Sequence, residues 1–178
     1  MRLFLAIDLP DSLKRECASF AKTELKGAKW ASPETLHLTL RFIGEFEESQ
    51  CQAICKSLRT LRCPSFPLSP QGLGCFPSET RPRILWLGLQ APPPLFALQS
   101  EIEAIVRGLG LAPEEKAFSP HITLARFRFS RLDQVTAFLE KHRAWKSQGF
   151  EVKNFILYSS ILRREGAEHR ALEIYPLS

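Results

Sequence analysis

Two tetrapeptides in this chain carry the residue types of acid–base chemistry. His37-Leu38-Thr39-Leu40 and His121-Ile122-Thr123-Leu124 each have a histidine in the first place and a threonine in the third. Each lies in an apolar run of the kind that forms a β-strand, where side chains alternate between the two faces. The histidine and threonine of each copy are therefore expected on one face, with the two aliphatic residues on the other.

A pair of histidines is suited to displacement at phosphorus. Free imidazole titrates near about pH 6.5, so one ring can accept a proton from water at neutral pH. The other ring, its pKa raised by an anionic substrate, can give a proton to the leaving oxygen. The hydroxyls of Thr39 and Thr123 can donate hydrogen bonds to phosphate oxygens. Neither motif carries a third metal ligand on the same face, so we expect no metal and no cofactor.

Strands and helices are predicted in the same order in two parts of the chain. The order strand, helix, loop, histidine strand, helix occurs in residues 1–61 and again in 83–142, which indicates two similar halves and an α/β or α+β fold. Apolar periodicity predicts strands at 3–7, 36–43, 66–68, 72–76, 83–89, 121–127, 150–159 and 171–176, and helices at 11–26, 47–61, 92–107 and 131–142.

The composition is that of a globular protein with a small basic excess. The chain has 178 residues, of which 44% are hydrophobic, enough for one domain with a full core. Its net charge of +5 favours an anionic partner such as phosphate or RNA. The five cysteines are an odd number without the spacing of a disulfide framework or a zinc site, which favours a reducing compartment. No apolar run is long enough to cross a membrane, and we expect a cytoplasmic protein.

Residues beyond the two tetrapeptides strengthen a resemblance to a known family. The two motifs with their flanking residues resemble the paired motifs of the 2H phosphoesterase superfamily. Within it the chain is most similar to the bacterial and archaeal RNA 2′,3′-cyclic phosphodiesterases, also called 2′-5′ RNA ligase-like proteins. The supporting residues are Arg2 to Ile7, Trp30, Phe42, Gly44, Gly74 to Pro77, Arg83 to Gly88, Ala125 and Arg126.

This resemblance implies a bilobal α+β fold, with residues 1–178 forming a single domain. Two antiparallel β-sheets related by a pseudo-twofold axis would carry helices on the outside and enclose a central cleft. The implied reaction is metal-independent hydrolysis of RNA 2′,3′-cyclic phosphate ends to 2′-phosphomonoesters. His37 is then the proton donor to O3′, His121 is the proton acceptor that activates water, and Thr39 and Thr123 bind the phosphate. The implied partner is RNA with such an end, for example a tRNA fragment, and we expect a monomer.

Four more residues are candidates for contacts with the substrate. Arg126 matches a basic residue near the phosphate in the family, although strict alternation turns it away from His121 unless the strand has a bulge. Arg41 continues the alternation of His37 and Thr39 and is expected to bind phosphate on their face. Phe76 is a candidate for stacking on a base, and Arg83 for a basic rim.

One tryptophan and the two other histidines are expected to lie outside the active site. Trp86, in the middle of an apolar strand, is expected in the core. His142 follows a helix between Lys141 and Arg143 and is expected in solvent, as is His169 in a charged turn.

Other functions are compatible with the same residues. A non-catalytic module that binds RNA or nucleotides would keep the cleft without turnover, and a cyclic phosphodiesterase for small nucleotides would use the same chemistry. Ligation through a 2′-5′ bond is a variant in which a 5′-hydroxyl takes the place of water. Turnover of an oligonucleotide with a cyclic phosphate end, in the presence of a chelator, separates an enzyme from a binding module.

Overall fold

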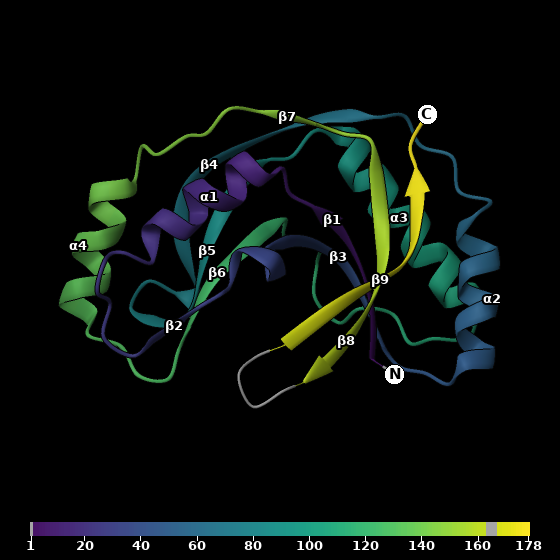
Figure 1. Cartoon of the computed structure of the whole chain (residues 1–178), viewed down its shortest axis with the longest axis horizontal. Helices are drawn as coiled ribbons and strands as arrows, with labels where there is room; N and C mark the ends of the chain where they lie inside the picture. Colours follow the sequence, from purple (N-terminus) through teal and green to yellow (C-terminus); the bar gives the residue numbers. More distant parts are fainter. Residues whose placement is uncertain (1, 163–166) are drawn as a thin grey trace.

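The computed structural model describes residues 2–162 and 167–178, apart from the side chains of residues 48–50 and 162. Its centre is a curled, antiparallel sheet with helices around it (Figure 1), as expected for an α+β fold. The strands follow the order β7-β4-β5-β6-β3-β1-β8-β9, and β2 pairs with β6. The strands are β1 (Arg2–Asp8), β2 (Ala28–Trp30), β3 (His37–Glu45), β4 (Phe66–Ser78), β5 (Arg81–Gln90), β6 (His121–Phe127), β7 (Phe150–Val152), β8 (Asn154–Leu162) and β9 (Ala167–Pro176).

The two sheets expected from the sequence are joined into one. The junction is the pairing of β3 with β6, the two strands that carry the repeated motifs, through Leu38 opposite Ile122. On the far side of each motif strand lies an apolar strand of the same half, β1 beside β3 and β5 beside β6. The two histidine motifs therefore meet at the centre of the sheet.

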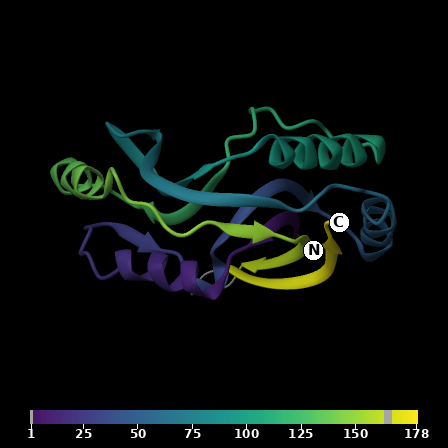
Figure 2. The same cartoon turned by 90° about the horizontal axis from the view of Figure 1, so that it is seen from above.

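Each half contributes a helix to the other half. The four helices are α1 (Asp11–Phe20), α2 (Glu48–Leu58), α3 (Pro93–Gly108) and α4 (Leu132–His142). At the end of α1, the ring of Phe20 packs edge-on against Phe138 and His142 of α4. Likewise α3, which follows β5, packs on β3 and α2. Figure 2 shows α1 and α4 in the same half of the molecule and α3 and α2 in the other.

Several element boundaries differ from the sequence prediction. The helix α1 ends at Phe20 rather than near residue 26, and the short strand β2 was not predicted. Residues 66–78 form one long strand rather than two short ones, despite their prolines and glycines. Its pairing with β5 shifts register between Pro70 and Leu73 and again between Phe76 and Pro77, so the irregular residues are absorbed without ending the strand. None of the helices in the described residues is long and apolar enough to cross a membrane.

Candidate active site

The two motif strands have the same pattern of burial. From His37 to Ile43 and from His121 to Phe127, positions one and three are half-buried, two, four and five are buried, six is exposed and seven is buried. Two buried residues in succession break the alternation of a regular strand. The same break at the same place in both strands indicates a shared backbone irregularity.

That irregularity is a β-bulge after each threonine. Along β1, Ala6 is opposite Thr39 but the next residue, Leu5, is opposite Arg41, so Leu40 is the extra residue. Along β5, Trp86 is opposite Thr123 and Leu85 is opposite Ala125, so Leu124 is the extra residue. Each bulge reverses the faces of the two residues that follow it, Arg41 and Phe42 in β3 and Ala125 and Arg126 in β6, and a second register shift occurs in β3 at Ile43.

The bulges exchange the expected places of two arginines. Arg126 lies beyond the bulge of β6, where it is exposed on the face of His121 and Thr123. Arg41 occupies the equivalent of Ala125, and only 7% of its side chain is exposed. The prediction that Arg41 shares the face of His37 is therefore wrong, because that prediction assumed uninterrupted alternation.

Arg41 is instead a buried cation at the centre of an ion-pair network that reaches the surface at Glu114. Its Nε donates to Glu103 Oε2 of α3 at 2.6 Å, and its Nη1 donates to Glu114 Oε1 at 2.8 Å. Its Nη2 donates to the carbonyl oxygen of Ala112 at 2.5 Å. Ala112 and Glu114 belong to the loop that leads into β6, so Arg41 ties the strand of His37 to the segment before His121.

The register of β3 and β6 brings the four motif side chains onto one face. Leu38 is opposite Ile122, and both are fully buried. Extending this antiparallel register by one residue in each direction places His37 opposite Thr123 and Thr39 opposite His121. Residues directly opposite each other in neighbouring strands point to the same face. Each histidine thus faces the threonine of the other motif, as a twofold arrangement requires.

Both imidazole rings are held by the same main-chain contact. His37 Nδ1 lies 2.7 Å from the carbonyl oxygen of Thr35, and His121 Nδ1 lies 2.7 Å from that of Ser119. Because a carbonyl oxygen only accepts hydrogen bonds, the proton of each neutral ring is assigned to Nδ1. Nε2 of each ring is then free to exchange a proton with a substrate.

His37 lies among other rings. Phe4 of β1 has its ring centroid 5.0 Å from that of His37, and Tyr158 of β8 stacks on Phe4 at 5.2 Å. His169 of β9 lies 5.2 Å from His37 and 4.9 Å from Phe4. The expectation that His169 is a solvated turn residue is therefore wrong, because the pairing of β9 with β8 turns this half-buried side chain toward the site.

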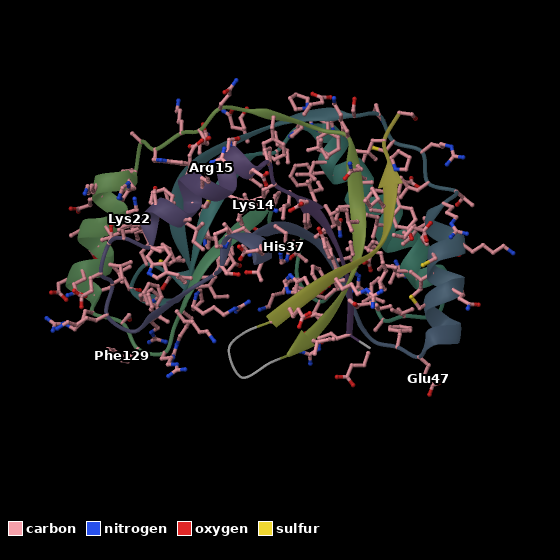
Figure 3. All side chains as sticks on the ribbon, in the orientation of Figure 1. Lys14, Arg15, Lys22, His37, Glu47 and Phe129 are labelled. Atoms are coloured by element: carbon pink, nitrogen blue, oxygen red, sulfur yellow. The ribbon has the colours of Figure 1, made fainter. Side chains whose placement is uncertain are left out.

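Burial lowers the pKa of His37 to about 4. The hydrogen bond to the Thr35 carbonyl opposes this shift, while repulsion from His169 adds to it. The carboxylate of Asp8, opposite His37 in β1, favours the charged ring, but Asp8 Oδ1 is also 2.7 Å from Lys14 Nζ. In Figure 3, Lys14 and His37 are labelled side by side near the middle of the molecule. Without a further negative charge, His37 is neutral at pH 7.

His121 has a different set of neighbours. The ring of Phe76 stands perpendicular to it with centroids 4.9 Å apart, and Trp86 lies 5.3 Å from Phe76. Trp86 is only half-buried and lies opposite Thr123, so it lines the histidine face rather than the core. Gly74, opposite Trp86, leaves room for the indole, since a Cβ there would lie 2.4 Å from it.

The side chains of Arg83 and His142 differ in their exposure to solvent. Arg83 is exposed and precedes Ile84, which lies opposite Arg126. His142 is not in solvent as expected, because it packs 4.6 Å from Phe138 with its Nε2 buried. Within residues 2–162 and 167–178, no three His, Cys, Asp or Glu side chains are grouped so that they could hold a metal ion.

Comparison with known proteins connects this geometry to a family. The model of the family described as LigT like Phosphoesterase matches the chain twice, at residues 7–86 and 87–167. The chain belongs to this family of 2H phosphoesterases. Each match holds one of the two histidine motifs, in agreement with the two halves inferred from the sequence.

Individual relatives match over nearly the whole length. The RNA 2′,3′-cyclic phosphodiesterase of Archaeoglobus fulgidus is 30% identical over 177 residues, which cover 98% of this chain and 99% of the relative. The crystal structure of TT0787 of Thermus thermophilus has a TM-score of 0.83 and 28% identity over 99% of this chain and 98% of the other. Escherichia coli LigT in complex with 3′-AMP has a TM-score of 0.82 and 26% identity over the same shares.

Proposed function

We propose that this protein is an RNA 2′,3′-cyclic phosphodiesterase that uses His37 and His121 as its acid and base. The observation that carries the proposal is the register of β3 and β6, which sets two histidine–threonine pairs on one face with each Nδ1 held by a carbonyl. A phosphate between the rings would meet an imidazole on each side. Relatives that cover nearly the whole chain carry the name of this activity.

The reaction follows from the roles that these groups can take. His121 Nε2 removes a proton from water as the water oxygen attacks phosphorus. The bond between phosphorus and O3′ breaks, and His37 Nε2 gives its proton to O3′. The products are a 2′-phosphomonoester and a free 3′-hydroxyl. Thr39 and Thr123 donate hydrogen bonds to the nonbridging oxygens, where negative charge develops.

Because the pKa of His37 is low in the free protein, this ring becomes an acid only when the substrate is bound. The proton donor must be charged when the substrate is bound, and burial opposes that charge in the free protein. The cyclic phosphate brings a negative charge to the ring and restores its affinity for a proton. Protonation of His37 is therefore coupled to binding of the anion, while the fixed Nδ1 proton keeps Nε2 directed to the phosphate.

Three further groups complete the proposed site. Arg126, exposed on the histidine face beyond the bulge, contacts a phosphate oxygen of the substrate. Phe76 supports the His121 ring and offers its edge to a nucleoside, and Arg83 adds positive charge near Arg126. That Escherichia coli LigT has been crystallised with 3′-AMP and with phosphate supports a phosphate-containing ligand here.

The decisive assay uses an RNA oligonucleotide with a 2′,3′-cyclic phosphate end in the presence of a chelator. We expect a product with a 2′-phosphate and a free 3′-hydroxyl, identified by phosphorus NMR. His37→Asn and His121→Asn should each lower turnover by about 10²–10⁴-fold without a change in melting temperature, while Thr136→Val, an exposed threonine on α4, should not affect turnover. Binding without turnover by the wild-type protein would contradict the proposal and support a binding module.

We also propose that the protein acts as a single-domain monomer in the cytoplasm on RNA fragments such as those of tRNA. The exchange of α1 and α3 between the halves supports one folding unit. All five cysteines are free, which is compatible with a reducing compartment. Light scattering during size-exclusion chromatography tests the monomer directly, since a dimer mass would contradict it.

A further inference from the structure

The two halves differ at equivalent positions just beyond the bulges. On the histidine face of β6 this position is Arg126, and on that of β3 it is Phe42, which is 58% exposed. Two residues further along, Arg128 follows β6 where β3 has Gly44. The site is therefore symmetric at its histidines and asymmetric along the strands that leave it.

A row of cations follows β6 away from His121. Lys29 of β2 is directly opposite Arg126 and shares its face. The pairing continues to Arg128, whose N–H donates to the carbonyl oxygen of Gly27 at 2.9 Å. The side chains of Lys29, Arg126 and Arg128 are exposed, and none has an ion-pair or hydrogen-bond partner in the part of the chain that the structure describes.

An exposed aromatic ring stands at the end of this row. Phe129 follows Arg128 and is 62% exposed, more than the other large hydrophobic residues of the described chain. Its main chain packs so closely on Gly27 that a Cβ there would lie 2.0 Å from the carbonyl oxygen of Phe129. The backbone beneath this ring is thus held in place while the ring itself faces solvent.

The opposite end of the molecule carries the opposite charge at the end of its motif strand. Glu45, which pairs with Arg2 at 3.8 Å, and Glu47 are exposed where β3 ends, in place of the cations beyond β6. In Figure 3, Phe129 and Lys22 are labelled at the end that holds α4, while Glu47 lies at the end that holds α2. A polyanion centred on the histidines therefore meets cations where β6 ends and carboxylates where β3 ends.

We propose that single-stranded RNA leaves the active site along β6 and β2, with Lys29, Arg126 and Arg128 at its phosphates and the ring of Phe129 stacked on a base. A cationic track combined with an exposed aromatic ring is the usual surface for single-stranded RNA. This inference rests on the proposed function, because it takes the cyclic phosphate between His37 and His121 as the end of the bound strand. It makes the enzyme sensitive to the length of the RNA.

The test compares a 2′,3′-cyclic mononucleotide with oligonucleotides of increasing length that end in the same nucleotide. For the wild-type protein, kcat/KM should rise with length and the gain should fall with added salt. In the Lys29→Met/Arg128→Met variant, the ratio of kcat/KM for the oligonucleotide to that for the mononucleotide should fall about tenfold. Phe129→Ala should lower the ratio by roughly fivefold or more, since stacking of one base contributes about 1–3 kcal/mol.

Matched controls lie at the other end of the molecule. Lys56 is an exposed lysine of α2, and Phe96 is a 43% exposed phenylalanine of α3. Lys56→Met and Phe96→Ala should leave the ratio unchanged. Equal ratios in the track variants and the wild type, or a wild-type ratio near one, would overturn the inference.

A binding measurement tests the cationic track independently of the reaction. Fluorescence anisotropy of labelled oligonucleotides that carry a 2′-phosphate end measures affinity without turnover. Weaker binding by the Lys29→Met/Arg128→Met variant supports the track even if the wild-type protein hydrolyses nothing, in which case only the proposed function fails. Unchanged binding of the long oligonucleotide overturns the track.

Discussion

The surroundings of the two histidines differ, although the strands that carry them have the same pattern of burial. His37 lies among Phe4, Tyr158 and a second histidine, whereas His121 has Phe76 on one side and Gly88 opposite it in β5. The bulge and the carbonyl contact at Nδ1 are the same in both. The backbone therefore sets where each ring lies, and the neighbouring strands set what surrounds it.

The largest effect should come from separating the roles of the two rings. His37→Asn and His121→Asn should each lower kcat by about 10²–10⁴-fold on an ordinary cyclic phosphate. In a substrate where sulfur replaces O3′, the leaving thiolate needs little help from an acid, so His37→Asn should recover most of its rate. His121→Asn should not recover. If the His121 variant recovers instead, the two roles are reversed.

Breaking the network of Arg41 should mainly affect stability. Arg41→Met removes a buried cation from two partly exposed carboxylates, Glu103 and Glu114, and leaves the carbonyl oxygen of Ala112 without its donor, which should lower the free energy of unfolding by about 2–3 kcal/mol. Urea denaturation measures the change. Arg131→Met, which breaks an exposed pair with Asp133, is the control and should have a much smaller effect. A loss as small as that of the control would show that Arg41 does not join the two halves.

The two threonines should behave alike, since each lies opposite the other motif's histidine. Thr39→Val and Thr123→Val keep the shape of the side chain and remove the donor to the phosphate, so each should lower kcat about 100-fold. Steady-state kinetics on a cyclic mononucleotide, which does not extend along the cationic track, compares the two variants. A strong effect of one variant alone would mean that the phosphate sits nearer one half.

Acid should destabilise the free protein through His37. The unfolded chain takes up a proton at this residue near about pH 6.5, but the folded protein does so only near pH 4, so stability falls as the pH drops between these values. From pH 8 to pH 5 the loss from this group should be about 2 kcal/mol. His37→Gln should lack that part of the pH dependence in urea denaturation. The same slope in both proteins would contradict the low pKa.

The smallest effect should come from His169. His169→Phe keeps a ring against Phe4 and removes the positive charge near His37, so the pKa of His37 should rise. NMR titration of the His37 ring in both proteins measures the shift directly. An unchanged pKa would mean that His169 does not contribute to the low pKa of His37.

The sequence predicted the structure best where the regular spacing of residues along a strand or a helix determines which face a side chain lies on. Alternation along each motif correctly placed its histidine and threonine on one face, and helical spacing located all four helices. Alternation could not reveal the bulges, because a bulge depends on the register with a neighbouring strand. This is why Arg41 was assigned to the wrong face, and why Arg126 needed a bulge to reach its own.

Contacts between distant segments were also hidden from sequence reasoning. His169 reaches His37 only because β9 pairs with β8 and β8 with β1, a chain of registers that the order of residues does not disclose. The exchange of α1 and α3 was missed for the same reason. The charged character of the segment around His169 pointed to solvent, and tertiary pairing outweighed it.

The carbonyl contacts at Nδ1 have a consequence for how the family can vary. The groups that orient His37 and His121 belong to the main chain of Thr35 and Ser119, so no change of side chain at these two positions removes them. A substitution at residue 35 or 119 therefore leaves the direction of the ring unchanged as long as the local backbone path is preserved, and at residue 35 the hydroxyl of Thr35 supports that path by donating to the carbonyl oxygen of Ser32 at 2.9 Å. The support for both rings thus lies in the main chain at positions whose side chains do not touch the imidazoles.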